Sequence, residues 1–514
     1  MTTFREIERK VRVSDSFDIA PVLENLGAYR SRRGPAFTML ADYYDTDELT
    51  LFRWRITMRR REGGVDQGWH LKLPITGGNA GDRDEVRLDL SDHVPARLGD
   101  IVSPLIGEKP LKPQVIVETL RTPVSIVDAD GLMLAEVVDD RVTVRLPGQP
   151  EAQFREIEVE AADAANPQSI ECMNFIVDCF LAAGGELGSS SKAASALGAR
   201  ASGECDVPEP RLPSSHVMAV DVIRVAIASG VRALMLADVD VRRDAPDSAH
   251  AMRVAARHLR AFLHTYGDFF DTGWRDRISE ELAWVASELG AIRDTEVLLA
   301  RLLDHAGALG EDDGARVSEF LSARVGQRLQ SARASALAAL RSDRHQYLIE
   351  DLIDAASNPS ALPLAYADYS ESMPRLAAAA WHEFRHVVRA LEINSPSAEW
   401  HHARILAKRA RYAMNALAPL EGKSVKRLAH ALSIATELLG IHQDAHVAQQ
   451  TLSSLAGAPS TSGSMGLLLG RLFEYESDEE ILDRYRFMDA WPDIKKAAKK
   501  VAKKAAKKVA KKPA

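Results

Sequence analysis

Alternation of polar and apolar residues dominates about the first 200 residues of the chain. Period-two alternation predicts β-strands. Turn-forming pairs such as Gly63-Gly64 and Pro147-Gly148 separate the runs. Helical spacing interrupts them at about 15–27 and 167–184. The predicted strands cover 4–13, 53–61, 69–73, 83–90, 114–121, 131–138, 141–146 and 153–161.

The second part of the chain has a different pattern. From residue 214 onward, Ala, Leu, Arg and Glu dominate, and apolar residues recur with the period of a helix. A segment rich in Gly and Pro precedes this change and is typical of a linker. We therefore predict a multidomain α+β protein, since 514 residues exceed one ordinary domain. Its parts are a β-rich domain at 1–200, a linker at 201–213, an all-helical domain at 214–490 and a Lys-rich tail at 491–514.

Charged residues occupy one face of nearly every predicted strand. Glu6, Glu8 and Lys10 share a face of the first strand, and Glu156 and Glu158 share a face of the last. A solvated outer face would explain one such strand. Repeated over eight strands and in both signs, the pattern favours a closed sheet, a β-barrel, whose lumen is lined by charge.

Acids and bases gathered in one lumen must satisfy one another or a ligand. Guanidinium and ammonium groups suit phosphate oxygens. Clustered carboxylates suit hard divalent cations such as Mg²⁺ or Mn²⁺. The combination indicates metal-assisted phosphoryl chemistry.

Seven short motifs follow one another along this domain. Together they resemble the CYTH domain of the triphosphate tunnel metalloenzymes, and the resemblance covers about residues 1–200. The first motif, ExExK, is weak alone, but the ordered set is specific. The motifs are Glu6-Ile7-Glu8-Arg9-Lys10, Tyr43-Tyr44-Asp45-Thr46, Met58-Arg59-Arg60-Arg61 (Met replaces Leu), Trp69-His70-Leu71-Lys72-Leu73, Arg83-Asp84-Glu85, Glu156-Ile157-Glu158-Val159-Glu160 and Ser191-Lys192.

The resemblance implies a tunnel of eight antiparallel strands that binds a triphosphate with the help of Mg²⁺ or Mn²⁺. The implied catalytic residues are Glu6, Glu8, Lys10 and Lys72. The implied phosphate-binding residues of the tunnel are Arg59, Arg61, Arg83, Arg121 and Lys192. The implied metal ligands are Glu6, Glu8, Glu85, Asp140, Glu156 and Glu158, where Asp140 is preferred to Asp139 because it shares the face of Glu136.

The helical domain contains an internal duplication. The two copies carry basic residues at offsets of 0, 3, 7 and 10, and their His-to-Asp separations, 44 and 43 residues, nearly agree. These offsets place each set on one face of a helix. Asp294 and Asp444 follow the two sets and are candidate partners in an Arg–Asp network. Because the basic residues outnumber them, we expect an anion to supply the remaining negative charge. The two sets are His250, Arg253, Arg257 and Arg260, and His401, Arg404, Lys408 and Arg411.

These elements resemble the CHAD domain, over about residues 214–490. The resemblance implies a helical bundle that binds inorganic polyphosphate through the two basic sets. The sequence departs from the family pattern at His258 and Gln443, where arginine is common. The departures leave fewer fixed charges for the anion.

The net charge of −8 conceals an asymmetry. Ten of the 18 lysines lie between Lys495 and Lys512, so removing them leaves −18 for residues 1–494. Repulsion within this tail predicts disorder when it is free. We expect it to bind nucleic acid or polyphosphate without sequence specificity.

The remaining features concern compartment and activity. Three cysteines without zinc spacing, no apolar span and a charged N-terminus favour a cytoplasmic protein without membrane contact. We predict a metal-dependent triphosphatase, a hydrolase, joined to a polyphosphate-binding module. The alternatives are a non-catalytic polyanion-binding protein and an adenylyl cyclase. The sequence leaves open the choice among triphosphate, polyphosphate, thiamine triphosphate and nucleotides, and also the metal and the oligomeric state.

Overall fold

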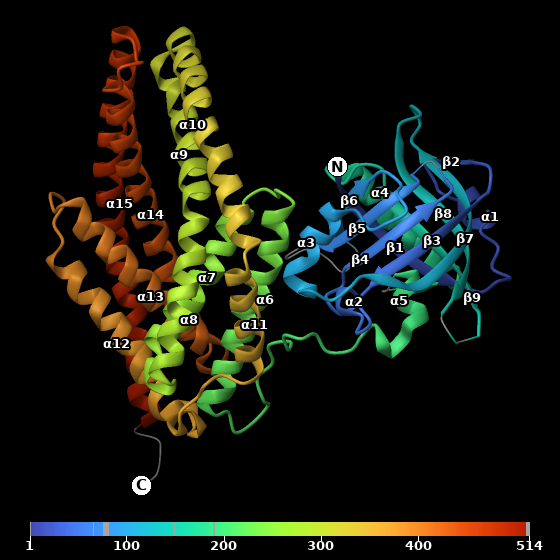
Figure 1. The fold of residues 1–514 in the computed structure, drawn as a ribbon, viewed down its shortest axis with the longest axis horizontal. Coiled ribbons are helices and arrows are strands. Elements are labelled where there is room, and N and C mark those ends of the chain that lie inside the picture. The colour runs from blue at the N-terminus through green and yellow to red at the C-terminus, as the bar shows by residue number, and fades with distance from the viewer. Residues whose placement is uncertain are drawn as a thin grey trace. The chain divides into compact units, whose positions relative to one another are not determined.

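The computed structural model describes residues 2–64, 66–75, 82–146, 148, 150–188 and 191–509. The chain divides into two compact units, Met1–Asp206 and Val207–Ala514 (Figure 1). The division falls inside the predicted linker. Each unit has its own hydrophobic core.

The first unit is a closed antiparallel β-barrel. Eight strands pair in the order β1-β6-β5-β4-β3-β7-β8-β9, and β9 pairs with β1 to close the ring. The predicted barrel is thus confirmed. The strands are β1 (Thr2–Val13), β3 (Phe37–Asp45), β4 (Thr57–Glu62), β5 (Gly68–Pro74), β6 (Asp82–Leu88), β7 (Lys112–Val127), β8 (Met133–Arg145) and β9 (Ala152–Ala161). Two short strands lie outside the ring: β2 (Arg30–Arg33) pairs with β7, and β10 (Glu186–Gly188) pairs with β1.

Two of the strand predictions were wrong. The runs at 131–138 and 141–146 form the single strand β8, and β3 was missed. β3 lacks clear alternation because Ala41 and Tyr43 are buried on its inner face while Leu40 is exposed on its outer face. In addition, the predicted strand at 53–61 begins only at Thr57, because helix α2 (Thr50–Arg53) precedes it.

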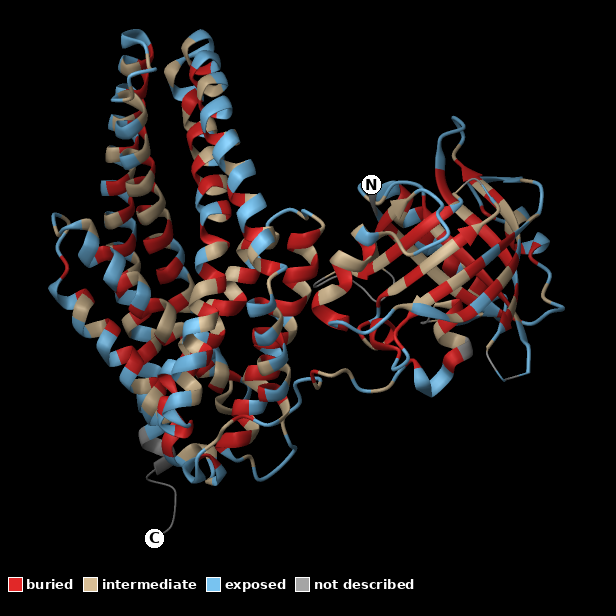
Figure 2. Ribbon diagram, in the orientation of Figure 1, coloured by how far each residue is buried: buried red, intermediate tan, exposed pale blue. Residues whose placement is uncertain are grey.

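The barrel is packed inside out. The outer faces of β1, β7, β8 and β9 are apolar, and helix α4 (Pro167–Ala182) covers them with residues such as Ile176 and Phe180. Asn166 caps α4 by accepting a hydrogen bond from the Gln168 amide. Short helices α2 and α5 (Lys192–Leu197) pack on a second apolar cluster that includes Tyr43 and Val117. Burial under α4, outside the ring, therefore leaves most of the lumen free for charge, while the cluster with Tyr43 and Val117 fills the inner face near one end of the barrel. Figure 2 shows the buried strand positions. The remaining helices of this unit are α1 (Ala20–Glu24), α3 (Ala96–Ile106) and the 3₁₀ turn η1 (Gly198–Arg200).

The second unit is all helical, and its two halves repeat. Helices α6 and α7 of the first half correspond to α12 and α13 of the second. The continuous α14 corresponds to α8 and α9, which are separated at Leu289. Helices α9, α10, α14 and α15 share one core and form a long four-helix extension (Figure 1). The helices are α6 (Ala219–Arg242), α7 (Ser248–Thr265), η2 (Gly267–Phe269), α8 (Thr272–Glu288), α9 (Gly290–Ala306), η3 (Gly307–Leu309), α10 (Glu311–Leu340), α11 (Asp343–Ser357), η4 (Pro363–Tyr366), α12 (Tyr369–Ala390), α13 (Ser397–Glu421), α14 (Lys423–Ala456) and α15 (Gly463–Val509).

The Lys-rich tail continues helix α15 as far as Val509, so the prediction of disorder was wrong for this part. Ile494 and Ala498 are buried against the bundle. Lys504 Nζ donates to the carbonyl oxygen of Glu421, the last residue of α13, at 2.8 Å. A cation suits this end of a helix because unpaired carbonyls gather there. Residues 510–514, which include Lys511 and Lys512, lie outside the described residues. Over the described part of the chain, no helix combines the length and apolarity needed to cross a membrane.

Candidate functional site

The lumen of the barrel holds a continuous network of charged side chains. Strand parity directs Glu6, Glu8 and Lys10 of β1 inward, opposite the apolar face under α4. Lys72 of β5 lies 2.5 Å from a Glu6 oxygen and 3.9 Å from a Glu8 oxygen. Lys10 Nζ lies 3.4 Å from Glu8 and also contacts Glu158 of β9. The structure thus brings the four predicted catalytic residues together, which parity alone did not determine.

The acids of β8 and β9 form the next part of the network. Lys192, at the start of α5, enters this cluster from outside the barrel ring. Its Nζ lies 2.9 Å from Asp140, 2.9 Å from Glu156 and 2.7 Å from Glu158. Arg121 of β7 pairs with Asp140 at 2.6 Å and with Glu158 at 2.7 Å. Burial alone would raise the pKa of Glu158, but the charges of Lys10, Lys192 and Arg121 hold it far below its ordinary value.

A third group lies on β4, β5 and β6. Glu85 is fully buried and accepts hydrogen bonds from His70 at 2.9 Å and from Arg87 at 2.6 Å. Arg59 lies 3.7 Å from Glu85 and donates to the Tyr43 hydroxyl at 3.3 Å. Burial would raise the pKa of Glu85, but the His70 hydrogen bond and the charges of Lys72 and Arg59 outweigh it and lower this pKa.

The other predicted phosphate-binding residues are also in the lumen. Arg61 pairs with Asp66, yet burial and then the nearby Arg59 lower its pKa to about 10. Arg83 faces Glu6 across the β1–β6 pair and donates to the carbonyl of Asp82. The charge of these arginines is therefore held close to carboxylates that a bound anion would have to replace.

Asp45 of the Tyr43–Thr46 motif has a structural role. Its carboxylate accepts from the amides of Thr46, Leu51 and Phe52 and fixes α2 at one end of the barrel. Burial raises its pKa to about 6 in spite of these bonds.

Two acids that the prediction left out have the least compensated charge. Glu160 pairs with Glu8 across β1–β9 and with Glu136 across β8–β9. Burial, followed by the charge of Glu6, raises the pKa of Glu160 to about 8. Burial also raises the pKa of Glu136 and of Glu6. A signal was present in the sequence, because Glu160 shares the face of Glu156 and Glu158.

A divalent cation fits the donor chemistry of the part of the lumen that holds Glu6, Glu8 and Glu160. Glu6, Glu8 and Glu160 offer only carboxylate oxygens, the ligands that Mg²⁺ and Mn²⁺ prefer. Burial, and then the charges of neighbouring glutamates, raise the pKa of Glu6 and of Glu160, so a bound cation would favour their ionised forms. Within the described ranges, no three such side chains yet converge as a metal site. The predicted ligands Glu85, Asp140, Glu156 and Glu158 contact basic residues, as Glu6 and Glu8 do, whereas no ion pair among the described residues involves Glu160.

The two basic sets of the helical unit lie on neighbouring helices. The His258 ring of α7 stacks on the Tyr412 ring of α13 with 4.6 Å between centroids. The Tyr266 hydroxyl donates to the Ala413 carbonyl at 3.0 Å. We call the surface formed by Arg253, Arg257, Arg404, Lys408 and Arg411 the basic groove. These residues were predicted from spacing alone, and their mutual proximity is evident from their effects on one another's pKa.

Glycines in the two duplicated elements lie beside the arginines. A Cβ at Gly290 would lie 3.7 Å from Arg253 Nη2, and a Cβ at Gly440 would lie 3.3 Å from Arg404 Nη2. Arg253 Nη1 also donates to Asp294 at 2.8 Å. Each guanidinium thus lies against the adjacent helix at equivalent positions of the repeat, and a Cβ would crowd it at Gly440 but make an ordinary contact at Gly290.

The basic groove contains more positive than negative charge. Arg253 pairs with Asp294, and Asp444 acts on Arg404, so the Arg–Asp network exists in part. The Nε atoms of Arg253, Arg404 and Arg411 are buried without a hydrogen-bond partner among the described residues. Burial, followed by the charges of Arg404 and Arg257, lowers the pKa of Lys408 to about 7. Such a cluster favours an anion.

The remaining members of the two sets differ in environment. Burial, with Arg293 as the next cause, lowers the pKa of His250 to about 4, so this ring is neutral near pH 7. His401 is exposed, and its Nδ1 lies 2.8 Å from the Gln443 side-chain oxygen. Arg260 is exposed, and its charge acts on His264.

Comparison with known proteins agrees with both units. A charge-lined antiparallel tunnel followed by a duplicated helical bundle defines a two-domain class of protein. The CYTH domain matches residues 5–173, and the CHAD domain matches residues 225–453. Two uncharacterised proteins of Mycobacterium tuberculosis, from two strains, are each 32% identical over 497 residues, which is 92% of this chain and 93% of theirs. The chain belongs to the family in which a CYTH domain is fused to a CHAD domain.

Solved structures with similarity cover parts of the chain. PptA from Streptomyces chartreusis is 25% identical, with a TM-score of 0.47, and the match covers 54% of this chain and 99% of that one. The CHAD domain from the plant Ricinus communis is 23% identical, with a TM-score of 0.47, over 55% of this chain and 94% of that one. A putative adenylate cyclase from Bacillus halodurans is 16% identical, with a TM-score of 0.24, over 38% of this chain and 99% of that one.

Proposed function

We propose that the tunnel hydrolyses inorganic triphosphate or related short phosphate chains with a divalent cation, and that the basic groove binds inorganic polyphosphate. One observation carries the proposal. The lumen holds uncompensated carboxylates beside a dense set of guanidinium and ammonium groups, in a single buried network. Membership of the triphosphate tunnel superfamily supports it.

Glu6, Glu8 and Glu160 would hold the cation. When bound, it would supply polarisation of phosphate oxygens and neutralise the charge that develops on them. The carboxylates would orient it, because β1 and β9 fix them on adjacent strands. Binding of the cation to Glu6 and Glu8 would release Lys72 from Glu6 and Lys10 from Glu8. Both ammonium groups would then be available to phosphate.

The basic side chains bind and orient the phosphate chain. Arg59, Arg61 and Arg83 present guanidinium groups from β4 and β6, and Arg121 and Lys192 present charge from β7 and α5. Their attachment to a closed barrel keeps them in place, which favours in-line geometry at the terminal phosphorus. Burial strengthens each charge–phosphate contact, because little water screens it.

The test is phosphate release from inorganic triphosphate with Mg²⁺ or Mn²⁺. We expect the double variant Glu6→Gln/Glu8→Gln to lose at least about 1,000-fold in kcat, or about 4 kcal/mol of activation free energy. Polyphosphate binding should be unchanged. Glu118→Gln, on the outer face of β7, is the matched control and should behave as wild type. Thiamine triphosphate and ATP serve as competing substrates. Equal activity of the double variant would refute the tunnel site.

A second candidate is a non-catalytic polyanion-binding protein. The observation that favours it is the pairing of Glu156 and Glu158 with Lys10, Lys192 and Arg121, because a cation at these acids would have to displace basic side chains. Wild type that binds triphosphate without releasing phosphate would establish this candidate.

A further inference from the structure

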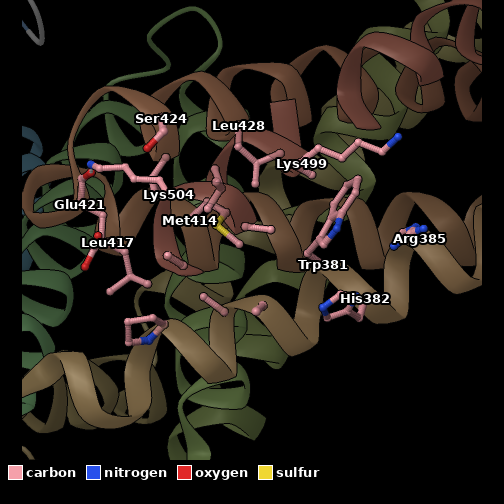
Figure 3. A pocket seen from close by; sticks show the side chains of 18 of the residues that line it. Trp381, His382, Arg385, Met414, Leu417, Glu421, Ser424, Leu428, Lys499 and Lys504 are labelled. Atoms are coloured by element: carbon pink, nitrogen blue, oxygen red, sulfur yellow. Dashed lines mark hydrogen bonds between the residues drawn. The ribbon is translucent and has the colours of Figure 1, made fainter. Parts of the chain in front are cut away.

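A cavity of about 340 Å³ lies within the helical unit, away from the basic groove (Figure 3). Helices α12, α13, α14 and the end of α15 line it, and it is partly open to solvent. Its volume falls in the range that holds small molecules. It is too small for a partner helix, which is about 10 Å across. The lining is mainly apolar and includes Pro374, Ala377, Ala378, Trp381, Met414, Leu417, Val425 and Leu428.

The Lys-rich tail supplies one wall of this cavity. Ala498, Val501, Ala502 and Ala505 line it at helical spacing of i, i+3, i+4 and i+7. Pairs of lysines in the repeat therefore alternate with apolar residues. These apolar residues form a stripe on one face of α15, and the stripe lines the cavity. Small side chains on this stripe leave the space open, because larger ones would fill it.

The two ends of the cavity differ in charge. At one end Trp381, His382 and Arg385 of α12 lie near Lys499 of α15, and Lys495 also lines this region (Figure 3). All the ionisable lining residues at this end are basic. The position of this end is fixed by the contact of Trp381 with Trp491, whose ring centroids are 5.7 Å apart.

The opposite end is closed by internal contacts. Lys504 donates to the Glu421 carbonyl, and the Tyr369 hydroxyl donates to the Glu421 carboxylate at 3.3 Å. The Ser424 hydroxyl oxygen is buried there without a hydrogen-bond partner among the described residues. Positive charge is therefore already engaged at this end, whereas near Trp381 the basic side chains lie at the rim of the apolar space, where Lys499 is exposed and Arg385 is partly buried.

We infer that this cavity binds a single-chain anionic amphiphile, an alkyl or acyl chain that ends in a phosphate or carboxylate group. The hydrocarbon lies along α12 between Trp381 and Leu417, where it replaces empty apolar space. The anionic group lies at the end formed by Arg385, Lys495 and Lys499. Between Ser370 and Arg385, α12 spans about 22 Å, which accommodates a medium-length chain.

The experiment is calorimetric titration of the full chain with dodecyl phosphate below its micelle concentration. We expect saturable binding of one molecule per chain. Dodecyl maltoside, which has the same chain and an uncharged head, should bind at least about tenfold more weakly. Inorganic phosphate should neither bind this site nor compete, and excess triphosphate should leave binding intact. Equal affinity for both dodecyl compounds, or competition by inorganic phosphate, would overturn the inference.

Paired variants locate the site. Ala378→Leu fills the cavity, while Ala379→Leu alters the exposed neighbour that does not line it. Lys499→Gln removes a head-group cation, while Lys503→Gln removes an exposed lysine of the same tail. The first member of each pair should weaken dodecyl phosphate binding at least about tenfold, and the second should not. Circular dichroism checks that each variant folds.

A vesicle assay separates a free amphiphile from a membrane surface. Vesicles of anionic phospholipid are sedimented with wild type and with Ala378→Leu. Vesicle binding that Ala378→Leu leaves unchanged, without binding of free dodecyl phosphate, would attribute the effect to surface adsorption through lysines and refute the cavity site.

Discussion

The tunnel lumen and the basic groove both concentrate cations, but they balance them differently. In the lumen, Lys192 contacts three carboxylates and Arg121 contacts two. In the groove, Arg253 has Asp294, whereas Lys408 is surrounded by arginines and has a lowered pKa. A ligand of the lumen must therefore exchange internal partners, and a ligand of the groove relieves repulsion that is already present. The first arrangement suits selective chemistry with a cation, and the second suits binding of a long polyanion.

The largest binding effect should follow loss of the two arginines that lie beside the duplicated glycines. We expect Arg253→Ala with Arg404→Ala to weaken polyphosphate binding at least about 100-fold, since each charge-assisted hydrogen bond contributes about 1.5–3 kcal/mol. Hydrolysis of triphosphate should not change. The measurement is titration with long-chain polyphosphate at fixed salt, together with the phosphate-release assay.

Arg328→Ala, an exposed arginine of α10, is the control for that double variant. Unchanged polyphosphate affinity in a folded double variant would return Arg253 and Arg404 to a structural role in the Arg–Asp network. Loss of hydrolysis as well would show that the two units do not divide the work.

The sequence predicted the charged faces of the lumen because side-chain parity is a local property of a strand. It placed Glu6, Glu8, Lys72 and Arg121 on inner faces, and all of them join the network. It did not predict which acid remains uncompensated. That depends on the register that sets Glu160 opposite Glu8 and Glu136, which only the closed ring determines.

The two misjudged segments have related causes. β3 lacked alternation because its inner face is apolar near one end of the barrel. The tail was predicted to be disordered because repulsion among its ten lysines was expected to outweigh the regular Ala and Val positions that a helix would have. The partners of these positions on α12 and α13 lie far away in sequence, so local pattern could not reveal them.

The uncompensated charge at Glu160 predicts a pH-dependent stability. The folded barrel raises its pKa to about 8, so the stability it contributes is complete below its ordinary pKa and is lost as pH rises through about 8. We expect Glu160→Gln to be more stable than wild type at pH 9 without divalent cations, by on the order of 2 kcal/mol. Near pH 4.5 the difference should vanish.

Urea unfolding with chelator at several pH values measures this effect. Added Mn²⁺ or Mg²⁺ should stabilise wild type at pH 9 and stabilise Glu160→Gln much less. The exposed Glu118→Gln variant controls for a general effect of charge. A variant whose stability follows wild type at every pH would mean that Glu160 is not the uncompensated acid, and would remove it from the proposed cation site.

The smallest effect expected is the pH dependence of polyphosphate affinity in the basic groove. Burial and the nearby Arg404 and Arg257 lower the pKa of Lys408 to about 7, so its contribution to stability is present above its ordinary pKa and is lost as pH falls through about 7. Bound phosphate oxygens favour the ammonium form and raise this pKa. Binding above pH 7 should therefore take up a proton, and affinity should fall as pH rises, by at most about tenfold per pH unit.

Lys408→Arg should remove that slope, because arginine keeps its charge across this range. Titration with polyphosphate between pH 7 and 9, in buffers of different ionisation enthalpy, measures both affinity and proton uptake. Lys426→Arg, at an exposed position of α14, should retain the wild-type slope. The Lys408→Arg substitution preserves positive charge in the groove. If the affinity for polyphosphate still depends on pH in this variant, another group takes up the proton on binding. The surplus charge of the groove would then be fixed at all pH values, and the contrast with the lumen would rest on the arginines alone.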